Sequence, residues 1–481
     1  MLFNSFTFMI FLPVVFLLYW FVFKRLKWQN LFILVASYVF YGWWDWRFLI
    51  LIAITSLSSF VSGLLIQRYE GNRRLQKTVS AVNIVINLGI LAVFKYFGFF
   101  MDSLNDLTAL FGLTLDWPTV NIILPVGISF YTFQALSYSI DVYSRRIQPT
   151  KDIIAFFSYI SFFPQLVAGP IERATNLLPQ ILNKRTFDYA QGVDGLRQIL
   201  WGFFKKLIIA DTCAEVVNPI WSDMSGQTGL NLLISLALFA FQIYADFSGY
   251  SDIAIGSAKL FGIQLSDNFK VPFFSRNMRE FWRRWHISLI GWFTQYVFFP
   301  LGGSRCSRSR TIFNILVVFT LSGLWHGANW TYVLWGIYNG LLFIPLILLP
   351  SQRYRDTVAH GRSLPTVKEF FSMALTFLLF ILGLIMFRAP DVQHIVECTR
   401  RLCSLSLFNY HGLTMKMATT LLWCLGLIIV EWIQRERQHV LQIDGYRVFS
   451  CSAVRLALYA ALIFLIFYFA GKVQTFIYFQ F

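Results

Sequence analysis

The residue best suited to catalysis is His326, in the run LSGLWHGANW at residues 321–330. A charged side chain costs about 2.5–3.5 kcal/mol at the centre of a membrane helix, and an imidazole exchanges protons near neutral pH. On a continuous helix, Ser322 and Asn329 share the face of His326, and Trp325 is its neighbour. We predict that His326 is catalytic and that Ser322, Trp325 and Asn329 help to bind substrate. The alternative is a neutral histidine that only bonds a neighbouring helix.

A second histidine, His286, closes the run FWRRWH at residues 281–286. Tryptophan and arginine side chains suit the boundary between lipid and water, so membrane anchoring is one interpretation. Arginine also binds phosphate through paired hydrogen bonds. We therefore predict that His286 belongs to the catalytic site, and that Arg283, Arg284 and Trp285 bind the phosphates and organic part of a cytoplasmic donor.

Acidic residues mark a third segment, YADFSGYSD at residues 244–252. We place Asp246 in the substrate site, where it orients an imidazole; pairing with an arginine or capping a helix are the alternatives. For Asp252, helix termination with an ion pair is at least as good an interpretation. Gln134 and Asp141 also lie in apolar surroundings, and we expect them to be structural. No role is predicted for the remaining histidines, which are His360, His394, His411 and His439.

The composition indicates an integral membrane protein. The chain has 481 residues, of which 57% are hydrophobic and 13% charged, whereas soluble domains carry about 25% charged residues. Its net charge of +16 fits basic cytoplasmic loops, and the basic residues are too scattered to indicate nucleic-acid binding. No metal site is predicted.

The apolar runs predict an all-α protein with about eleven transmembrane helices plus re-entrant or interfacial helices. Lys24, Arg25 and Lys27 follow the first run, which places the N-terminus outside the cytoplasm. Residues 102–121 are expected to form an outer loop, and residues 122–143 the fifth span. Residues 153–168 are expected to form a broken element, because Pro164 interrupts them. Residues 287–301 are too short to cross the membrane and are expected to be re-entrant.

Several motifs resemble those of the membrane-bound O-acyltransferases. The resemblance rests on FWRRWHIS (281–288), LGGSR (301–305) and GLWHGAN (323–329), with support from LPVGISF (124–130), AGPI (168–171) and DFSGYSD (246–252). The branch is similar to the alginate O-acetyltransferases, with teichoic acid D-alanyltransferases more distant. The resemblance covers residues 1–345, and residues 346–481 are expected to be C-terminal transmembrane helices of the same single domain, 1–481.

The resemblance implies helices around a central funnel that opens to the cytoplasm, in the bacterial inner membrane. His326 matches the family's essential buried histidine, and His286 its second histidine position. The implied donor is acetyl-CoA or another acyl thioester, with no permanently bound cofactor. The implied acceptor is a hydroxyl of an extracytoplasmic polysaccharide or of a periplasmic partner. The implied partners are membrane lipids, an esterase-like periplasmic acetyltransferase and a polysaccharide synthase complex.

The residues also allow other classes of protein. A proton-coupled transporter or flippase would use His326 and Asp246 as relay residues, because buried ionisable groups serve that purpose too. Transporters often have paired halves with interrupted helices, and no such repeat occurs in the sequence. A scaffold for an envelope complex is a third possibility. Activity on a thioester separates the enzyme from the other two.

Overall fold

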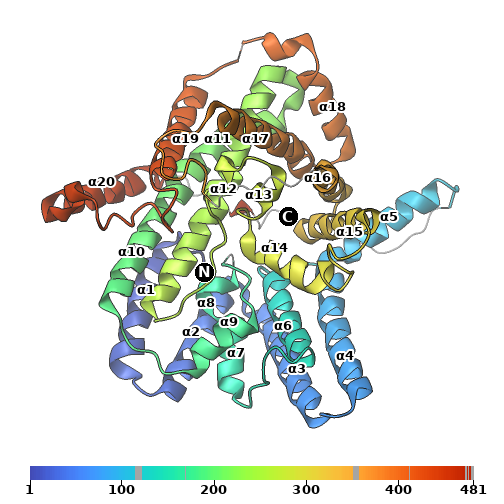
Figure 1. Cartoon of the computed structure of the whole chain (residues 1–481), viewed down its shortest axis with the longest axis vertical. Coiled ribbons are helices and arrows are strands. Elements are labelled where there is room, and N and C mark those ends of the chain that lie inside the picture. Colours follow the sequence, from blue (N-terminus) through green and yellow to red (C-terminus); the bar gives the residue numbers. More distant parts are fainter. Residues whose placement is uncertain are drawn as a thin grey trace. The chain divides into compact units, whose positions relative to one another are not determined.

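The computed structural model describes residues 1–113, 122–167, 169–349, 357–410, 412–471, 474 and 476–477. All regular structure in these residues is helical, as predicted, and they contain no strand (Figure 1). The chain divides into two compact units, Met1–Gly195 with Ser257–Ser266, and Leu196–Gly256 with Asp267–Phe481. The single-domain organisation stays a prediction.

Unit 1 is a bundle of helices around the buried helix α6. Gly63 lets α3 approach α6, because a Cβ atom at that position would lie 2.5 Å from the Tyr138 hydroxyl oxygen. Helix α6 also packs against α4, α7 and α9. The helices are α1 (Phe6–Leu17), α2 (Leu26–Asp45), α3 (Leu49–Arg68), α4 (Arg73–Leu91), α5 (Phe97–Ala109), α6 (Ile128–Tyr143), α7 (Ile153–Ser161), α8 (Phe163–Leu166) and α9 (Ala174–Leu182).

Two details of unit 1 differ from the predicted spans, and one agrees. Helix α6 begins at Ile128, six residues after the predicted start, because Pro125 and the left-handed Gly127 (φ 75°) precede it. Helix α5 continues to Ala109, so the predicted outer loop is helical in its first part; residues 114–121 lie outside the described residues. The broken element is confirmed, since α7 and α8 are separated at Phe162.

Unit 2 contains most of the C-terminal helices. Two of its helices, α15 and α16, pack closely and lie side by side (Figure 1). A Cβ atom on Gly323 would lie 2.1 Å from the carbonyl oxygen of Tyr332, so only glycine allows these backbones to touch. The helices are α11 (Asp211–Ser222), α13 (Met278–Trp282), α14 (Ile287–Phe293), α15 (Arg308–His326), α16 (Trp330–Leu348), α17 (Val367–Arg388), α18 (Val392–Leu402), α19 (Met415–Ile433) and α20 (Ser452–Phe469).

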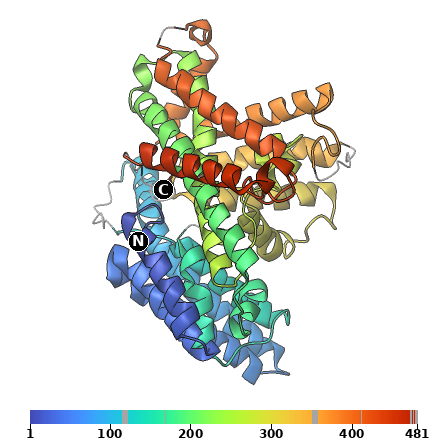
Figure 2. The ribbon, with the colours of Figure 1, turned by 90° about the vertical axis from the view of Figure 1, so that its left-hand side faces the viewer.

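Two further helices belong to both units. They are α10 (Tyr189–Phe204) and α12 (Gly229–Leu260). A π-helical turn, Lys205–Ala210, follows α10 and packs against α20 in unit 2; Figure 2 shows α20 in red crossing the green segment. The apolar run at residues 229–247 predicts one ordinary span, but helix α12 continues beyond it to Leu260.

Seven helical segments in the described residues are long and apolar enough to cross a membrane. They are Leu26–Arg68, Arg73–Ala109, Gly229–Leu260, Trp330–Leu348, Val367–Arg388, Met415–Ile433 and Ser452–Phe469. Phe6–Val22 and Ile287–Phe298 are apolar but shorter, and the second agrees with the short element expected at residues 287–301. The multi-pass architecture is confirmed, while the number of about eleven spans stays a prediction.

Candidate active site

The two predicted histidines meet in unit 2. His326 is the last residue of α15, and His286 directly precedes α14 with a left-handed backbone (φ 46°). Their ring centroids are 6.4 Å apart, and they are 5% and 1% exposed. The fold thus brings together two imidazoles that lie 40 positions apart in the sequence.

Aromatic rings enclose both histidines. The His326 ring lies 5.0 Å from Trp325, 5.1 Å from Trp335 and 5.4 Å from Phe387, measured between centroids. The His286 ring lies 5.9 Å from Trp325 as well. Trp325 therefore contacts both imidazoles. Such an enclosure strengthens electrostatic interactions inside it, because it keeps water away.

Asn268 holds His286 in place. Its Oδ1 atom lies 3.2 Å from Nδ1 of His286 and accepts from the Ser288 hydroxyl at 2.8 Å, while its Nδ2 atom donates to Ser251 Oγ at 3.2 Å. His286 lies between α13 and α14, outside the candidate spans, and burial lowers its pKa to about 3. The neutral ring therefore carries its proton on Nδ1, and its Nε2 atom is an acceptor. Sequence reasoning missed Asn268, since nothing in its local sequence distinguishes it from any loop asparagine.

We predict that Asn268→Ala lowers turnover about tenfold to a hundredfold, because a lost hydrogen bond at a buried group costs about 1–3 kcal/mol. Asn268 is a positioning residue, so the pH profile of kcat/KM is the decisive measurement. Asn268→Asp should move that profile to higher pH, since a carboxylate beside His286 favours its charged form. The exposed Asn183→Ala is the control. An unchanged pH profile in both Asn268 variants would contradict the positioning role.

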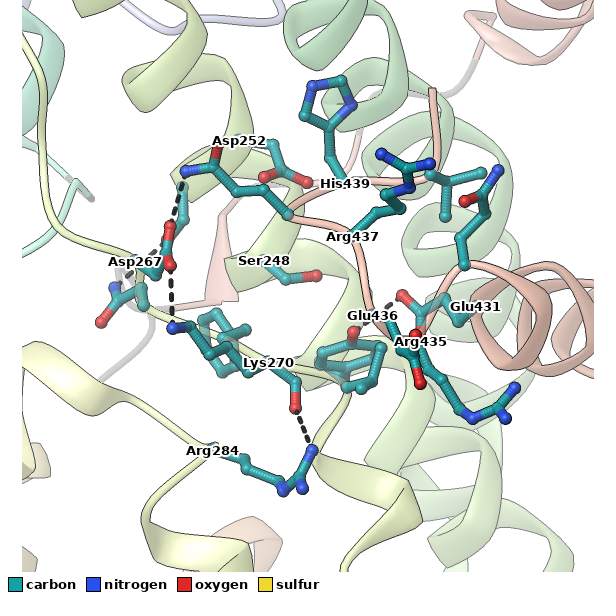
Figure 3. Close-up of a pocket in the computed structure, with 18 of the residues that line it drawn as sticks. Ser248, Asp252, Asp267, Lys270, Arg284, Glu431, Arg435, Glu436, Arg437 and His439 are labelled. Carbon is teal, nitrogen blue, oxygen red and sulfur yellow. Dashed lines mark hydrogen bonds and ion pairs between the residues drawn. The ribbon is translucent and has the colours of Figure 1, made fainter. Parts of the chain in front are cut away.

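A cavity of about 920 Å³ opens on the other side of Asn268. Figure 3 shows Asp267, Lys270 and Arg284 on one wall, facing residues 431–439 on the other. The charged residues that line it are Lys205, Lys270, Arg279, Arg283, Arg284, Arg435, Arg437, Asp252, Asp267, Glu280, Glu431 and Glu436. Cations therefore outnumber carboxylates in the lining. This excess favours an anionic ligand.

Two of these cations are available to a ligand. The side chains of Arg283 and Arg437 form no ion pair or hydrogen bond with the described residues. By contrast, Arg284 pairs with Glu280 at 2.8 Å. Arg283 and Arg284 both line the cavity, and their binding of donor phosphates stays a prediction. Trp285 does not line the cavity. Its side chain is buried and stacks on Phe281, with ring centroids 5.4 Å apart.

Residues 431–440 supply the opposite wall, and sequence reasoning missed them. His439, for which no role was predicted, is buried and lines this cavity together with Glu431 and Arg437. The available signal was the run QRERQH directly after an apolar helix. A charged run at that place is also typical of an ordinary cytoplasmic loop, so the sequence alone did not single it out.

The prediction that Asn329 shares a helix face with His326 is wrong. Helix α15 ends at His326, because Gly327 is extended (φ −158°). Asn329 instead caps α16, where its side chain accepts from the Thr331 amide at 3.0 Å and donates to the Pro390 carbonyl at 2.9 Å. Ser322 does lie on α15, one turn before His326, and is buried.

The three interpretations of Asp246 are also wrong. It lies inside α12 and pairs with Lys206 at 2.8 Å, and it accepts from the Ile477 amide at 2.8 Å. Lys206 also pairs with Asp211 at 2.9 Å. Asp252 does not end the helix either, although its predicted ion pair is confirmed, with Lys205 at 2.6 Å. Ion pairs with lysines on the π-helical turn Lys205–Ala210 therefore explain how both aspartates are accommodated inside α12.

The fold and site define a class of protein: a multi-pass membrane protein with two histidines buried beside a cation-lined cavity. The model of the MBOAT, membrane-bound O-acyltransferase family matches residues 35–387. The chain belongs to this family and is an O-acyltransferase enzyme. The transporter and scaffold interpretations are therefore set aside.

Several curated proteins are similar to this chain. A protein named "Probable alginate O-acetylase AlgI" from Pseudomonas aeruginosa is 39% identical over 82% of this chain and 73% of its own length. The peptidoglycan O-acetyltransferase of Helicobacter pylori is 29% identical, with 100% of this chain and 98% of the relative covered. The teichoic acid D-alanyltransferase of Bacillus subtilis is 29% identical over 47% of this chain and 59% of its own length.

Proposed function

We propose that the protein transfers an acetyl group from a cytoplasmic acyl thioester to a hydroxyl outside the cytoplasm, with His326 as the general base. The observation that carries this proposal is the pair of buried imidazoles, 6.4 Å apart, that Asn268 links to a cation-lined cavity. Two relatives are named as O-acetyl-transferring enzymes, which favours acetyl among the acyl groups.

His326 would perform the proton transfers. A hydroxyl is a weak nucleophile at neutral pH, so it needs a base within hydrogen-bond reach. The imidazole removes the hydroxyl proton as the oxygen attacks the thioester carbonyl. The carbon–sulfur bond then breaks, and the thiolate receives that proton from the imidazolium. His286 would orient the donor near this carbonyl, and alignment of the two substrates supplies much of the remaining acceleration.

The large cavity is suited to the donor. Its volume of about 920 Å³ lies in the usual range for ligand pockets, and the arginines on its walls match phosphate groups. Coenzyme A carries such phosphates, and acetyl-CoA is made in the cytoplasm. We therefore assign the cavity to acetyl-CoA, which is consumed as a substrate, and we place this side in the cytoplasm of a bacterial inner membrane with the N-terminus outside.

The acceptor side is proposed from the relatives. Their printed names refer to alginate, peptidoglycan and teichoic acid, which are polymers that carry hydroxyl groups outside the cytoplasm. We propose an envelope or exported polysaccharide as the final acceptor, reached directly or through an esterase-like periplasmic acetyltransferase. A polysaccharide synthase complex would supply the polymer.

The direct test is an incubation of the purified protein, in detergent, with acetyl-CoA labelled in the acetyl group. We expect slow thioester hydrolysis without an acceptor and label transfer when the polysaccharide and periplasmic partner are added. Absence of both, with partners present, would contradict an acetyl-CoA-dependent enzyme.

Substitution of the two available arginines tests the donor cavity. Arg283→Gln and Arg437→Gln should each raise the KM for acetyl-CoA about tenfold with little change in kcat, because each loses a charge-assisted hydrogen bond worth about 1.5–3 kcal/mol. Steady-state kinetics measure this effect. The exposed Arg74→Gln is the matched control. If kcat falls while KM stays constant, these arginines do not bind the donor.

A further inference from the structure

A second, smaller cavity lies between α11, α19 and α20 in unit 2. Its volume is about 310 Å³, near the lower limit for ligand pockets. The residues that line it are Leu207, Asp211, Thr212, Glu215, Lys416, Thr419, Thr420, Trp423, Tyr468 and Phe469. The function proposed above does not use this cavity.

The cavity lies toward the opposite end of α19 from the donor cavity. It is lined by the N-terminal half of this helix, from Lys416 to Trp423, whereas Glu431 near the C-terminus of α19 lines the donor cavity. Trp423 and Glu431 are eight positions apart, which corresponds to about 12 Å along the helix. Because α19 is a candidate membrane span, the small cavity lies nearer the membrane face opposite to the donor.

The polar groups of this cavity are mainly acceptors. Thr419 and Thr420 both donate to the Lys416 carbonyl, at 3.0 and 2.8 Å, and Thr212 donates to the Ile208 carbonyl. Their hydroxyl hydrogens are therefore engaged, so the oxygens face a ligand as acceptors. Ionised carboxylates are acceptors only. A complementary ligand must therefore bring hydrogen-bond donors, as the hydroxyl groups of a sugar do.

The charges of the lining disfavour an anion. Lys416 is the only lysine or arginine among the described lining residues, and it pairs with Glu215 at 2.6 Å. Asp211 pairs with Lys206 at 2.9 Å. Both carboxylates and Lys416 are therefore already engaged in ion pairs, and the described lining residues leave no cation available for a phosphate or a uronic acid. An uncharged ligand needs no such cation.

Aromatic rings provide an apolar wall. Trp423 meets Phe469 edge to face, with centroids 5.6 Å apart, and Tyr468 lies 5.3 Å from Phe469. Tyr468 is 74% exposed and forms the rim. A pyranose ring combines apolar C–H faces with a ring of hydroxyl donors, which matches an aromatic wall opposite acceptor oxygens.

We propose that this cavity binds an uncharged sugar unit of the acceptor polysaccharide. Its role as an acceptor site rests on the proposed function, whereas sugar binding itself does not. The proposal also narrows the acceptor class, because a polymer of uronic acids would find no available cation among the described lining residues.

Isothermal titration calorimetry on the full-length protein in detergent tests this proposal. The probes are hexamers of β-1,4-linked glucose, of N-acetylglucosamine and of mannuronate. We expect at least one uncharged hexamer to bind about tenfold or more tightly than the uronate. Because no thioester is present, this result is independent of whether acetyl transfer occurs.

Two variants locate the binding. Trp423→Ala should weaken binding of the uncharged hexamer about threefold to tenfold. Glu215→Gln should weaken it about tenfold and reduce the discrimination against the uronate. Glu215→Gln also keeps the test valid if Trp423→Ala fails to fold. The control is Leu422→Ala, an exposed neighbour on α19, which should bind like the unmodified protein.

Three outcomes would overturn the proposal. The first is equal or tighter binding of the uronate hexamer. The second is unchanged sugar affinity in both folded variants. The third is binding of phosphatidylethanolamine, supplied in mixed micelles, with no sugar bound, because a lipid ammonium group would then be the occupant.

Discussion

Replacement of His326 by alanine or glutamine should lower acetyl transfer by about 10²–10⁴-fold, the usual contribution of a positioned general base. Glutamine keeps much of the volume and hydrogen-bonding capacity of the imidazole, but it cannot accept the proton of the attacking hydroxyl. Both variants should therefore lose kcat while donor affinity changes little. Release of labelled acetate and label transfer to the polysaccharide measure the effect.

The matched control is His394→Gln, because His394 is exposed and pairs with Asp391, which lies outside the histidine pair and both cavities. It should retain ordinary turnover. Protein levels and melting temperature in detergent must be compared for every variant, since His326 is packed among aromatic rings. A His326→Gln protein with normal abundance and full acetylation would refute the assignment of the base.

Substitution of Lys206 by methionine should have the largest effect on stability. Lys206 is buried between Asp211 and Asp246, with its Nζ atom 2.9 and 2.8 Å from their oxygens. Its removal leaves two buried carboxylates without their shared cation, which costs about 3–5 kcal/mol. We expect poor accumulation in the membrane and a clearly lower melting temperature in detergent.

A charge-neutral variant distinguishes the electrostatic cause from lost packing. Lys206→Met combined with Asp211→Asn and Asp246→Asn removes all three charges, and replacing a whole buried ion group is often close to neutral. The triple variant should therefore be more stable than Lys206→Met alone. The exposed Lys77→Met is the control. If the triple variant is no more stable than the single one, the charge cluster does not explain the role of Lys206.

The differences between expectation and structure share a cause. The span expected to end near residue 247 continues to Leu260, although its second half contains Asp246 and Asp252. Lysines from the π-helical turn neutralise both carboxylates, so these charges no longer oppose a buried helix. The hydropathy of one segment contains no information about an ion-pair partner that a distant segment supplies.

The same limit explains why only part of the candidate site was predicted from the sequence. His326, His286, Arg283 and Arg284 are prominent because polar residues are unusual among so many apolar ones, and this signal is local. Asn268 and Arg437 carry no such signal, because an asparagine or arginine in a polar connection is ordinary. Their importance comes from the neighbours that folding gives them.

The sequence alone determined the membrane class, the helical fold and the two histidines, because length, hydropathy and isolated polar residues are properties of single segments. The tertiary structure decided that the imidazoles lie 6.4 Å apart, that Asn268 contacts one of them, and that residues 431–440 complete the cation-lined cavity. Those facts depend on which helices pack together, and packing is set by side-chain fit and charge pairing between segments distant in the chain.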